Sequence, residues 1–122
     1  FIFLASSLYA TEEKCVQILI KNHTKDTTKI LSRKDAEASA KVIISYNNKT
    51  ASLKFDALKD KEYFNYVGQS QGLAKYFSKK NYVIKLNKEK HFFILSMNLY
   101  DELIDSTYLC GNTYEHSLRQ LP

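Results

Sequence analysis

Two hairpin patterns constrain the fold of this chain more than any other feature of its sequence. The first covers residues 42–58, where an apolar strand, the turn Asn47-Asn48 and a second strand follow one another. In the second strand, small and apolar residues alternate strictly with Thr, Ser, Lys and Asp, which is typical of a strand with one buried face. Asn tolerates positive φ, so we expect a tight primed turn at Asn47-Asn48.

The second hairpin covers residues 82–97, with its turn at residues 87–90. Its second strand is apolar on both faces, which favours a position inside a closed or two-layered sheet. Weaker patterns predict further strands at residues 15–20, 29–32, 63–67 and 107–110. Short, regularly spaced strands of this kind indicate a small antiparallel β-barrel or sandwich with meander connections.

Two segments favour helix. Ser32 is a suitable N-cap for residues 33–41, which contain the helix-favouring run 35–40, and residues 101–104 are long enough for one turn. The β-branched residues that follow position 41 resist continuation of the first helix. We therefore expect a mostly β fold with at most one or two short helices.

The length of 122 residues corresponds to one domain. Residues 1–10 form an apolar run that ends in an abrupt polar switch, which we interpret as the remnant of a signal peptide cleaved after Ala10 or, alternatively, after Ser7. The other interpretation of this run is a first β-strand. Residues 11–122 are then a single exported β domain, periplasmic or secreted. No later stretch is apolar enough to predict a membrane span.

Two cysteines, Cys15 and Cys110, lie near the two ends of this domain. An even number of cysteines behind an export signal favours one disulfide, which would join the first strand to the last. A pair of buried free thiols is the alternative. The three histidines are scattered singly without the spacing of zinc ligands, so we expect no metal and no cofactor.

The net charge of +5 comes from 16 Lys and only two Arg. Six Lys fall between residues 75 and 90, with Tyr76 and Tyr82 among them. A nucleic-acid interface would be expected to use Arg for phosphate and base contacts, so we interpret this segment as a solvated face and expect no nucleic-acid partner. Alternation over residues 82–86 predicts that Tyr82 points inward and Lys85 outward.

The sequence contains no pattern that indicates catalysis. Three Gly and one Pro leave no phosphate-binding loop, and no His stands in a recognisable relation to a Ser or Cys nucleophile. We interpret the acidic residues at 101–105 as a solvated turn. Two glycosylation sequons, at Asn22 and Asn48, matter only in a eukaryotic source. We therefore predict a binding protein rather than an enzyme.

Three segments form an ordered pattern. The first is the hairpin with the alternating strands Val42-x-Ile44-x-Tyr46 and Ala51-x-Leu53. The second is the run Ser70-Gln71-Gly72-Leu73-Ala74-Lys75-Tyr76, and the third is the hairpin from Tyr82 to Leu95 with Lys88 in its turn. This order resembles the periplasmic and membrane-bound inhibitors of c-type lysozyme. Those proteins are small exported bacterial β-barrels in which a terminal disulfide is common.

The resemblance implies a binding site. In that family a Ser-Gly loop and a hairpin Lys enter the lysozyme cleft and engage its catalytic carboxylates. Here Ser70 matches the first loop Ser, Gly72 stands at the second Ser position, Lys75 and Tyr76 match the following Arg-Tyr, and Lys88 matches the hairpin Lys. Leu73 and Glu89 replace the two glycines of the pattern. We expect the loop from Ser70 to Tyr76 and the hairpin tip to be presented together.

Two alternative functions remain open. The run Asp105-Ser106-Thr107-Tyr108-Leu109-Cys110 is similar to one in immunoglobulin-like receptor and adhesion modules, although the core Trp is absent and the two cysteines are far apart. The Phe and Tyr residues would suit a lipocalin-like carrier of a small apolar ligand. Such a carrier requires a larger closed barrel than we expect from a chain of this length.

Overall fold

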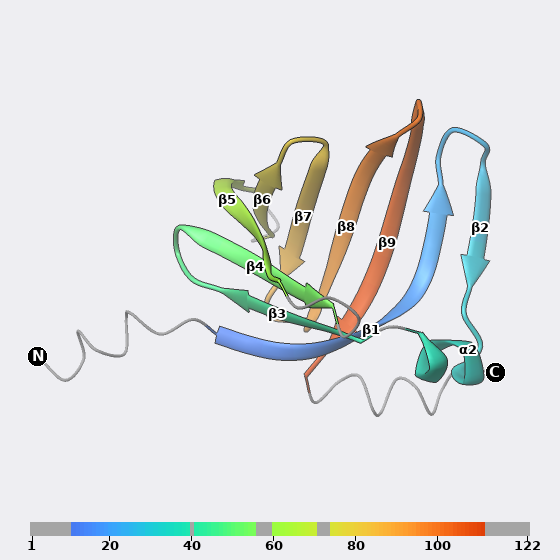
Figure 1. Cartoon of the computed structure of the whole chain (residues 1–122), viewed down its shortest axis with the longest axis horizontal. Coiled ribbons are helices and arrows are strands. Elements are labelled where there is room, and N and C mark those ends of the chain that lie inside the picture. Colours follow the sequence, from blue (N-terminus) through green and yellow to red (C-terminus); the bar gives the residue numbers. More distant parts are fainter. Residues whose placement is uncertain (1–10, 40, 56–59, 71–73, 112–122) are drawn as a thin grey trace, which may run out of the picture.

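The computed structural model describes residues 11–39, 41–55, 60–70 and 74–111 (Figure 1). The interpretation of residues 1–10 as a signal peptide therefore lies outside the described residues. One short helix, α2 (Arg33–Ala38), accompanies nine strands. The strands are β1 (Thr11–Asn22), β2 (Thr27–Ile30), β3 (Val42–Tyr46), β4 (Thr50–Phe55), β5 (Glu62–Gln69), β6 (Lys75–Lys79), β7 (Tyr82–Asn87), β8 (Phe92–Leu99) and β9 (Glu102–Cys110).

The sheet closes on itself through β1. Residues 11–15 of this long strand pair with β3, and residues 15–22 pair with β9, with a register shift between Gln17 and Leu19. From β3 to β9 each strand pairs with the next along the chain. The result is a closed, antiparallel eight-stranded barrel, with β2 as an additional strand beside β1. The predicted mostly β fold with meander connections is confirmed.

Because neighbouring strands are antiparallel, the connections alternate between two ends of the barrel. We call one the Lys88 end; it carries the turn at 47–49, the residues Ser70 and Ala74, and the turn at 88–91. We call the other the Tyr100 end; it carries the turns at 80–81 and 100–101. β6 joins the two ends in five residues, or about 13 Å of strand.

Large apolar side chains fill the barrel between its two ends. Phe77, Ile84, Leu86 and Phe93 are fully buried there and belong to one core cluster. The alternation of β7 is as predicted: Tyr82 lines the interior, whereas Lys85 is exposed. Close packing of this middle layer holds the strand ends on either side in fixed positions.

A disulfide joins the first and last strands of the barrel. Cys15 and Cys110 are bonded, they lie directly opposite each other in the register of β1 and β9, and both are completely buried. The predicted bridge is confirmed. It joins adjacent strands of one closed sheet, unlike the bridge between two sheets that defines an immunoglobulin-like sandwich.

The helix packs outside the barrel. The hydroxyl oxygen of Ser32 accepts a hydrogen bond from the backbone N–H of Asp35 at 3.1 Å, so the predicted N-cap is confirmed. Ala36 is buried against Val16 and Leu31, forming a second small cluster on the outer side of β1. The helix ends at Ala38, three residues before the predicted boundary. Among the described residues, no helix has the length and apolar character that a membrane crossing requires.

Three local predictions are wrong. The Asn47-Asn48 turn is not primed, because neither residue has positive φ; instead the side chain of Asn47 accepts hydrogen bonds from the backbone N–H groups of Lys49 and Thr50. Residues 102–104 extend β9 rather than forming a helical turn. Residues 75–79 form a strand, β6, that the sequence analysis did not assign.

Candidate functional site

The two segments expected to bind a partner leave the barrel at the same end. In the register of the sheet, Gln69 pairs with Lys75, and Lys75 pairs with Leu86. β6 is therefore the one strand between the strand end before Ser70 and the strand end before Lys88. The antiparallel order β5-β6-β7 brings together two segments whose key residues are 18 positions apart in sequence.

Ser70 begins a short segment whose base is closed by a hydrogen bond. Its backbone N–H donates to the carbonyl oxygen of Ala74 at 2.9 Å, and Ala74 is itself buried. The Ser70 side chain is half-buried and its hydroxyl forms no hydrogen bond within the part of the chain that the structure describes. Gly72, the second predicted contact residue here, lies outside the described residues.

The turn that carries Lys88 is held to three strands. Within the turn, the N–H of Lys90 donates to the side-chain oxygen of Asn87 at 3.0 Å. The N–H of Cys110 in β9 donates to the carbonyl oxygen of His91 at 2.7 Å, and the His91 ring contacts the carboxylate of Glu13 in β1 at 2.7 Å. Lys88 itself is exposed at the tip of a turn that is fixed by contacts with β1, β7 and β9.

Lys75 and Tyr76 do not belong to the loop in which they were expected. Both are in β6, because Phe77 must enter the core and the alternation of the strand then fixes its neighbours. Lys75 shares the inner face with Phe77, at the rim of the barrel. Tyr76 lies on the outer face, opposite Lys85. The structure thus places Lys75 near Ser70 and Lys88, and Tyr76 on the barrel wall.

Positive charge is left unpaired at the Lys88 end. None of four lysines there forms an ion pair with a described residue; these are Lys49, Lys75, Lys88 and Lys90. Three of the four ion pairs found in the described residues lie at the Tyr100 end instead, where they join Lys25 to Glu102, His23 to Asp105 and Lys79 to Glu62. The Lys88 end thus presents several lysines, together with the carboxylate of Glu89, that form no ion pair with a described residue; Lys80 at the Tyr100 end likewise forms none.

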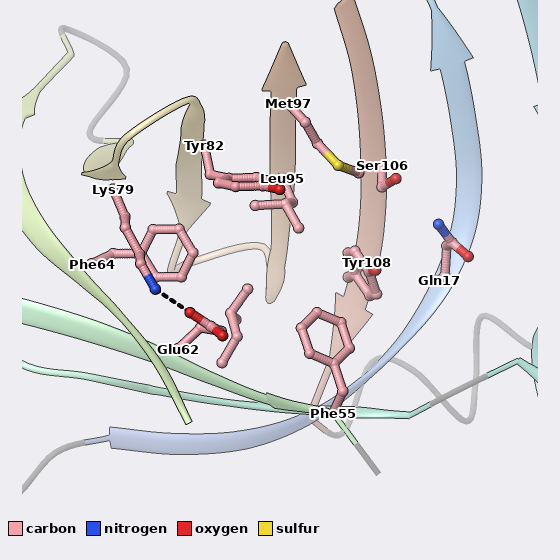
Figure 2. Close-up of a pocket in the computed structure, with 11 residues that line it drawn as sticks. Gln17, Phe55, Glu62, Phe64, Lys79, Tyr82, Leu95, Met97, Ser106 and Tyr108 are labelled. Carbon is pink, nitrogen blue, oxygen red and sulfur yellow. Dashed lines mark hydrogen bonds and ion pairs between the residues drawn. The ribbon is translucent and has the colours of Figure 1, made fainter. Parts of the chain in front are cut away.

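A cavity of about 340 Å³ opens at the Tyr100 end (Figure 2). It is lined by inward-facing residues of β1 and of β4 to β9: Gln17, Leu53, Phe55, Glu62, Phe64, Lys79, Tyr82, Leu95, Met97, Ser106 and Tyr108. The expectation that a chain of this length could not close a barrel around such a space is wrong. Eight strands suffice, because from β3 to β9 no connection is longer than six residues.

The cavity has a polar side within its apolar lining. Ser106 and Tyr108 are buried, yet neither hydroxyl forms a hydrogen bond with a described residue. Burial raises the pKa of the Tyr108 phenol above its usual value of 10.0. Among the described residues, every side-chain polar atom that is fully inaccessible to solvent has a hydrogen-bond partner. The two unpaired hydroxyls are therefore accessible, and they are reached through the cavity that they line.

The cavity and the ion pair between Glu62 and Lys79 at its mouth do not follow from the sequence patterns. The alternation of β7, which predicts that Tyr82 points inward, is the one sequence signal for a residue of the cavity lining. The position of the cavity along the barrel depends on which side chains of all eight strands lie at the same height. That is set by the register between strands, and the pattern of a single strand does not reveal it. Within the described ranges, no group of three or more His, Cys, Asp or Glu could hold a metal ion.

Comparisons of this chain with protein-family models, with curated proteins and with solved structures give no match.

Proposed function

We propose that the protein binds in the active-site cleft of a c-type lysozyme and blocks it with the Lys88 end of the barrel. The observation that carries the proposal is the arrangement of Ser70 and Lys88. Antiparallel pairing of β5, β6 and β7 brings their segments to one end, and the ammonium group of Lys88 has no ion-pair partner among the described residues. Two further features, the small β-barrel and the bridge near the two ends of the domain, agree with the inhibitors that the sequence resembles.

The chemistry of inhibition follows from the catalytic carboxylates of a glycosidase. One of them must hold a proton at neutral pH in order to donate it to the leaving group. An ammonium group placed beside that carboxyl lowers its pKa, so the acid is deprotonated and cannot act. The inserted turn also excludes the sugar chain from the cleft. Lys88 would supply the ammonium group, and Ser70 would donate a hydrogen bond to the second carboxylate.

The fixed geometry of the turn supports this function. A flexible lysine loses side-chain and loop entropy when it is immobilised in a cleft. Here the backbone that follows Lys88 is already held, because the Asn87 side chain accepts a hydrogen bond from the N–H of Lys90 and β9 donates one to the carbonyl oxygen of His91. Less ordering is then required on binding, which favours a tight complex.

Titration calorimetry against a c-type lysozyme tests the proposal directly. We expect one-to-one binding that weakens when the cleft is first saturated with a chitin oligosaccharide, because both ligands occupy the same site. The variant Lys88→Ala should bind more weakly, whereas Lys54→Ala, which removes an exposed lysine from the wall of β4, should bind like the wild type. Absence of binding, or binding that the oligosaccharide does not affect, would refute the proposal.

A further inference from the structure

We propose that the cavity at the Tyr100 end binds a small, neutral and mostly apolar molecule that carries a hydrogen-bonding group. This function goes beyond the one proposed above, because it uses the opposite end of the barrel. A volume of about 340 Å³ lies within the range of small-molecule sites, which starts at about 300 Å³. An eight-stranded barrel is also the size that holds one small ligand.

The walls of the cavity are mainly apolar. Phe55, Leu95, Met97 and the rings of Tyr82 and Tyr108 point toward a common space from β4, β7, β8 and β9 (Figure 2). The Tyr108 ring is held in place by stacking on Phe93, with 4.7 Å between ring centroids. Burial of an apolar molecule against these fixed surfaces is favourable in proportion to the apolar area that it removes from water.

The polar side of the cavity favours a ligand with a hydroxyl or a similar group. Ser106 is 3% exposed and Tyr108 is 7% exposed, and neither hydroxyl has a hydrogen-bond partner among the described residues. Because both hydroxyls are reached through the cavity, a wholly apolar ligand would displace water from them and leave them unpaired. A ligand that donates to one of these oxygens, or accepts from it, replaces the hydrogen bonds to water that it displaces.

The charges of the lining select against an anion. Among the described residues of the lining, Glu62 and Lys79 are the two that carry a charge, and they form an ion pair with each other across β5 and β6 (Figure 2). A ligand carboxylate would compete with Glu62 for Lys79 and would leave one carboxylate without a partner in a partly buried site. A neutral molecule leaves the pair intact.

A fluorescent probe tests the site. N-phenyl-1-naphthylamine is neutral and apolar, carries one N–H group, and emits more strongly in apolar surroundings. We expect its emission to rise saturably, with one probe per protein, in the full chain with its disulfide intact. No saturable rise would overturn the proposal.

Matched serine variants locate the probe. Ser106→Leu fills the polar side of the cavity and should weaken probe binding by about tenfold or more. Ser96→Leu makes the same change on the outer face of the neighbouring strand β8 and should leave binding within about twofold of the wild type. If Ser106→Leu does not fold, as judged by circular dichroism, Met97→Trp blocks the cavity mouth and Asn98→Trp is its control. Equal binding by a cavity variant and its control would show that the probe lies elsewhere.

Competition identifies the class of ligand. Decanol and decanoate have the same chain length but differ in charge at neutral pH. We expect decanol to displace the probe at a concentration about tenfold lower than decanoate does. Equal or stronger displacement by decanoate would contradict the inference of a neutral ligand.

Discussion

At the scale of single residues, buried tyrosines make the stability of the barrel depend on pH. Burial raises the pKa of Tyr108, and burial together with the nearby Glu13 carboxylate raises the pKa of Tyr46. The unfolded chain releases these protons first as the pH rises above about 10, so alkaline pH favours unfolding. The stabilising contribution is present in full below pH 10 and is lost as the pH rises toward the folded-state pKa values.

Urea unfolding measured from pH 8 to pH 11 checks this dependence. We expect Tyr108→Phe to lose less stability over this range than the wild type, because phenylalanine does not titrate. Tyr100→Phe removes a phenol that is 91% exposed and should follow the wild-type curve. Identical curves for Tyr108→Phe and the wild type would show that the buried phenol does not contribute.

Some residue positions could be predicted from the sequence and others could not. Ser32 as N-cap and Lys85 as an outward residue follow from local chemistry and strand alternation, and both are confirmed. The geometry of the Asn47 turn could not be predicted, because an Asn side chain either allows positive φ or accepts backbone hydrogen bonds itself. The residue type is compatible with both, and the strands decide between them.

At the scale of elements, the bridge between β1 and β9 should be a large part of the stability. The bonded cysteines are 95 residues apart in sequence, so the bridge restricts most of the unfolded chain. In the chain-entropy model a loop of this size contributes about 4–5 kcal/mol. We expect the double variant Cys15→Ser/Cys110→Ser to lose about that much free energy of unfolding.

Urea unfolding of the oxidised wild type, the reduced wild type and the double variant measures this contribution. The reduced protein and the variant should unfold at similar urea concentrations, both well below the oxidised protein. An unchanged midpoint after complete reduction would contradict the assigned role of the bridge in closing the barrel.

The strands with the clearest alternation of apolar and polar residues are the ones that the sequence predicts best. The two long hairpins have clear alternation and are confirmed at residues 42–55 and 82–97. β6 was missed because its sequence places lysines at both ends of a five-residue strand, so its single buried side chain, Phe77, gives no repeating pattern. Acidic residues are compatible with a helical turn and with an exposed strand, so the sequence does not decide between the two at the start of β9. In the structure this segment is a strand, and the carboxylates of Glu102 and Asp105 contact the side chains of Lys25 and His23.

At the scale of the whole molecule, net charge should affect how fast the proposed complex forms. The protein carries +5 and c-type lysozymes are themselves basic, so the two proteins repel at long range. Raising the salt from about 0.01 M to about 0.15 M shortens the Debye length from about 30 Å to about 8 Å. The association rate should therefore rise with salt, the opposite of a pair with complementary net charges.

Stopped-flow association kinetics at the two salt concentrations check this effect. A variant in which lysines on the barrel wall are replaced, Lys54→Ala/Lys85→Ala, should associate faster than the wild type at low salt and show a smaller salt dependence. An association rate that falls with salt would mean that local attraction outweighs the net repulsion.

The molecule as a whole has two different ends, and this difference was only partly predictable. The order of the strands follows from short connections, and that order is enough to bring Ser70 and Lys88 to one end. The hollow at the other end depends on which layer of side chains fails to fill the barrel. That property arises from eight strands together and is visible only in the folded structure.

Lysis of lysozyme-sensitive cells, followed by turbidity, tests the central claim most directly. An excess of the wild-type protein should suppress lysis by a c-type lysozyme, and Lys88→Ala should require about tenfold more protein for the same effect. Lys85→Ala, which removes the same charge from the wall of the same hairpin, should act like the wild type. Unimpeded lysis with wild-type protein at both low and moderate salt, or equal effects of the two substitutions, would contradict the proposed role of the Lys88 end.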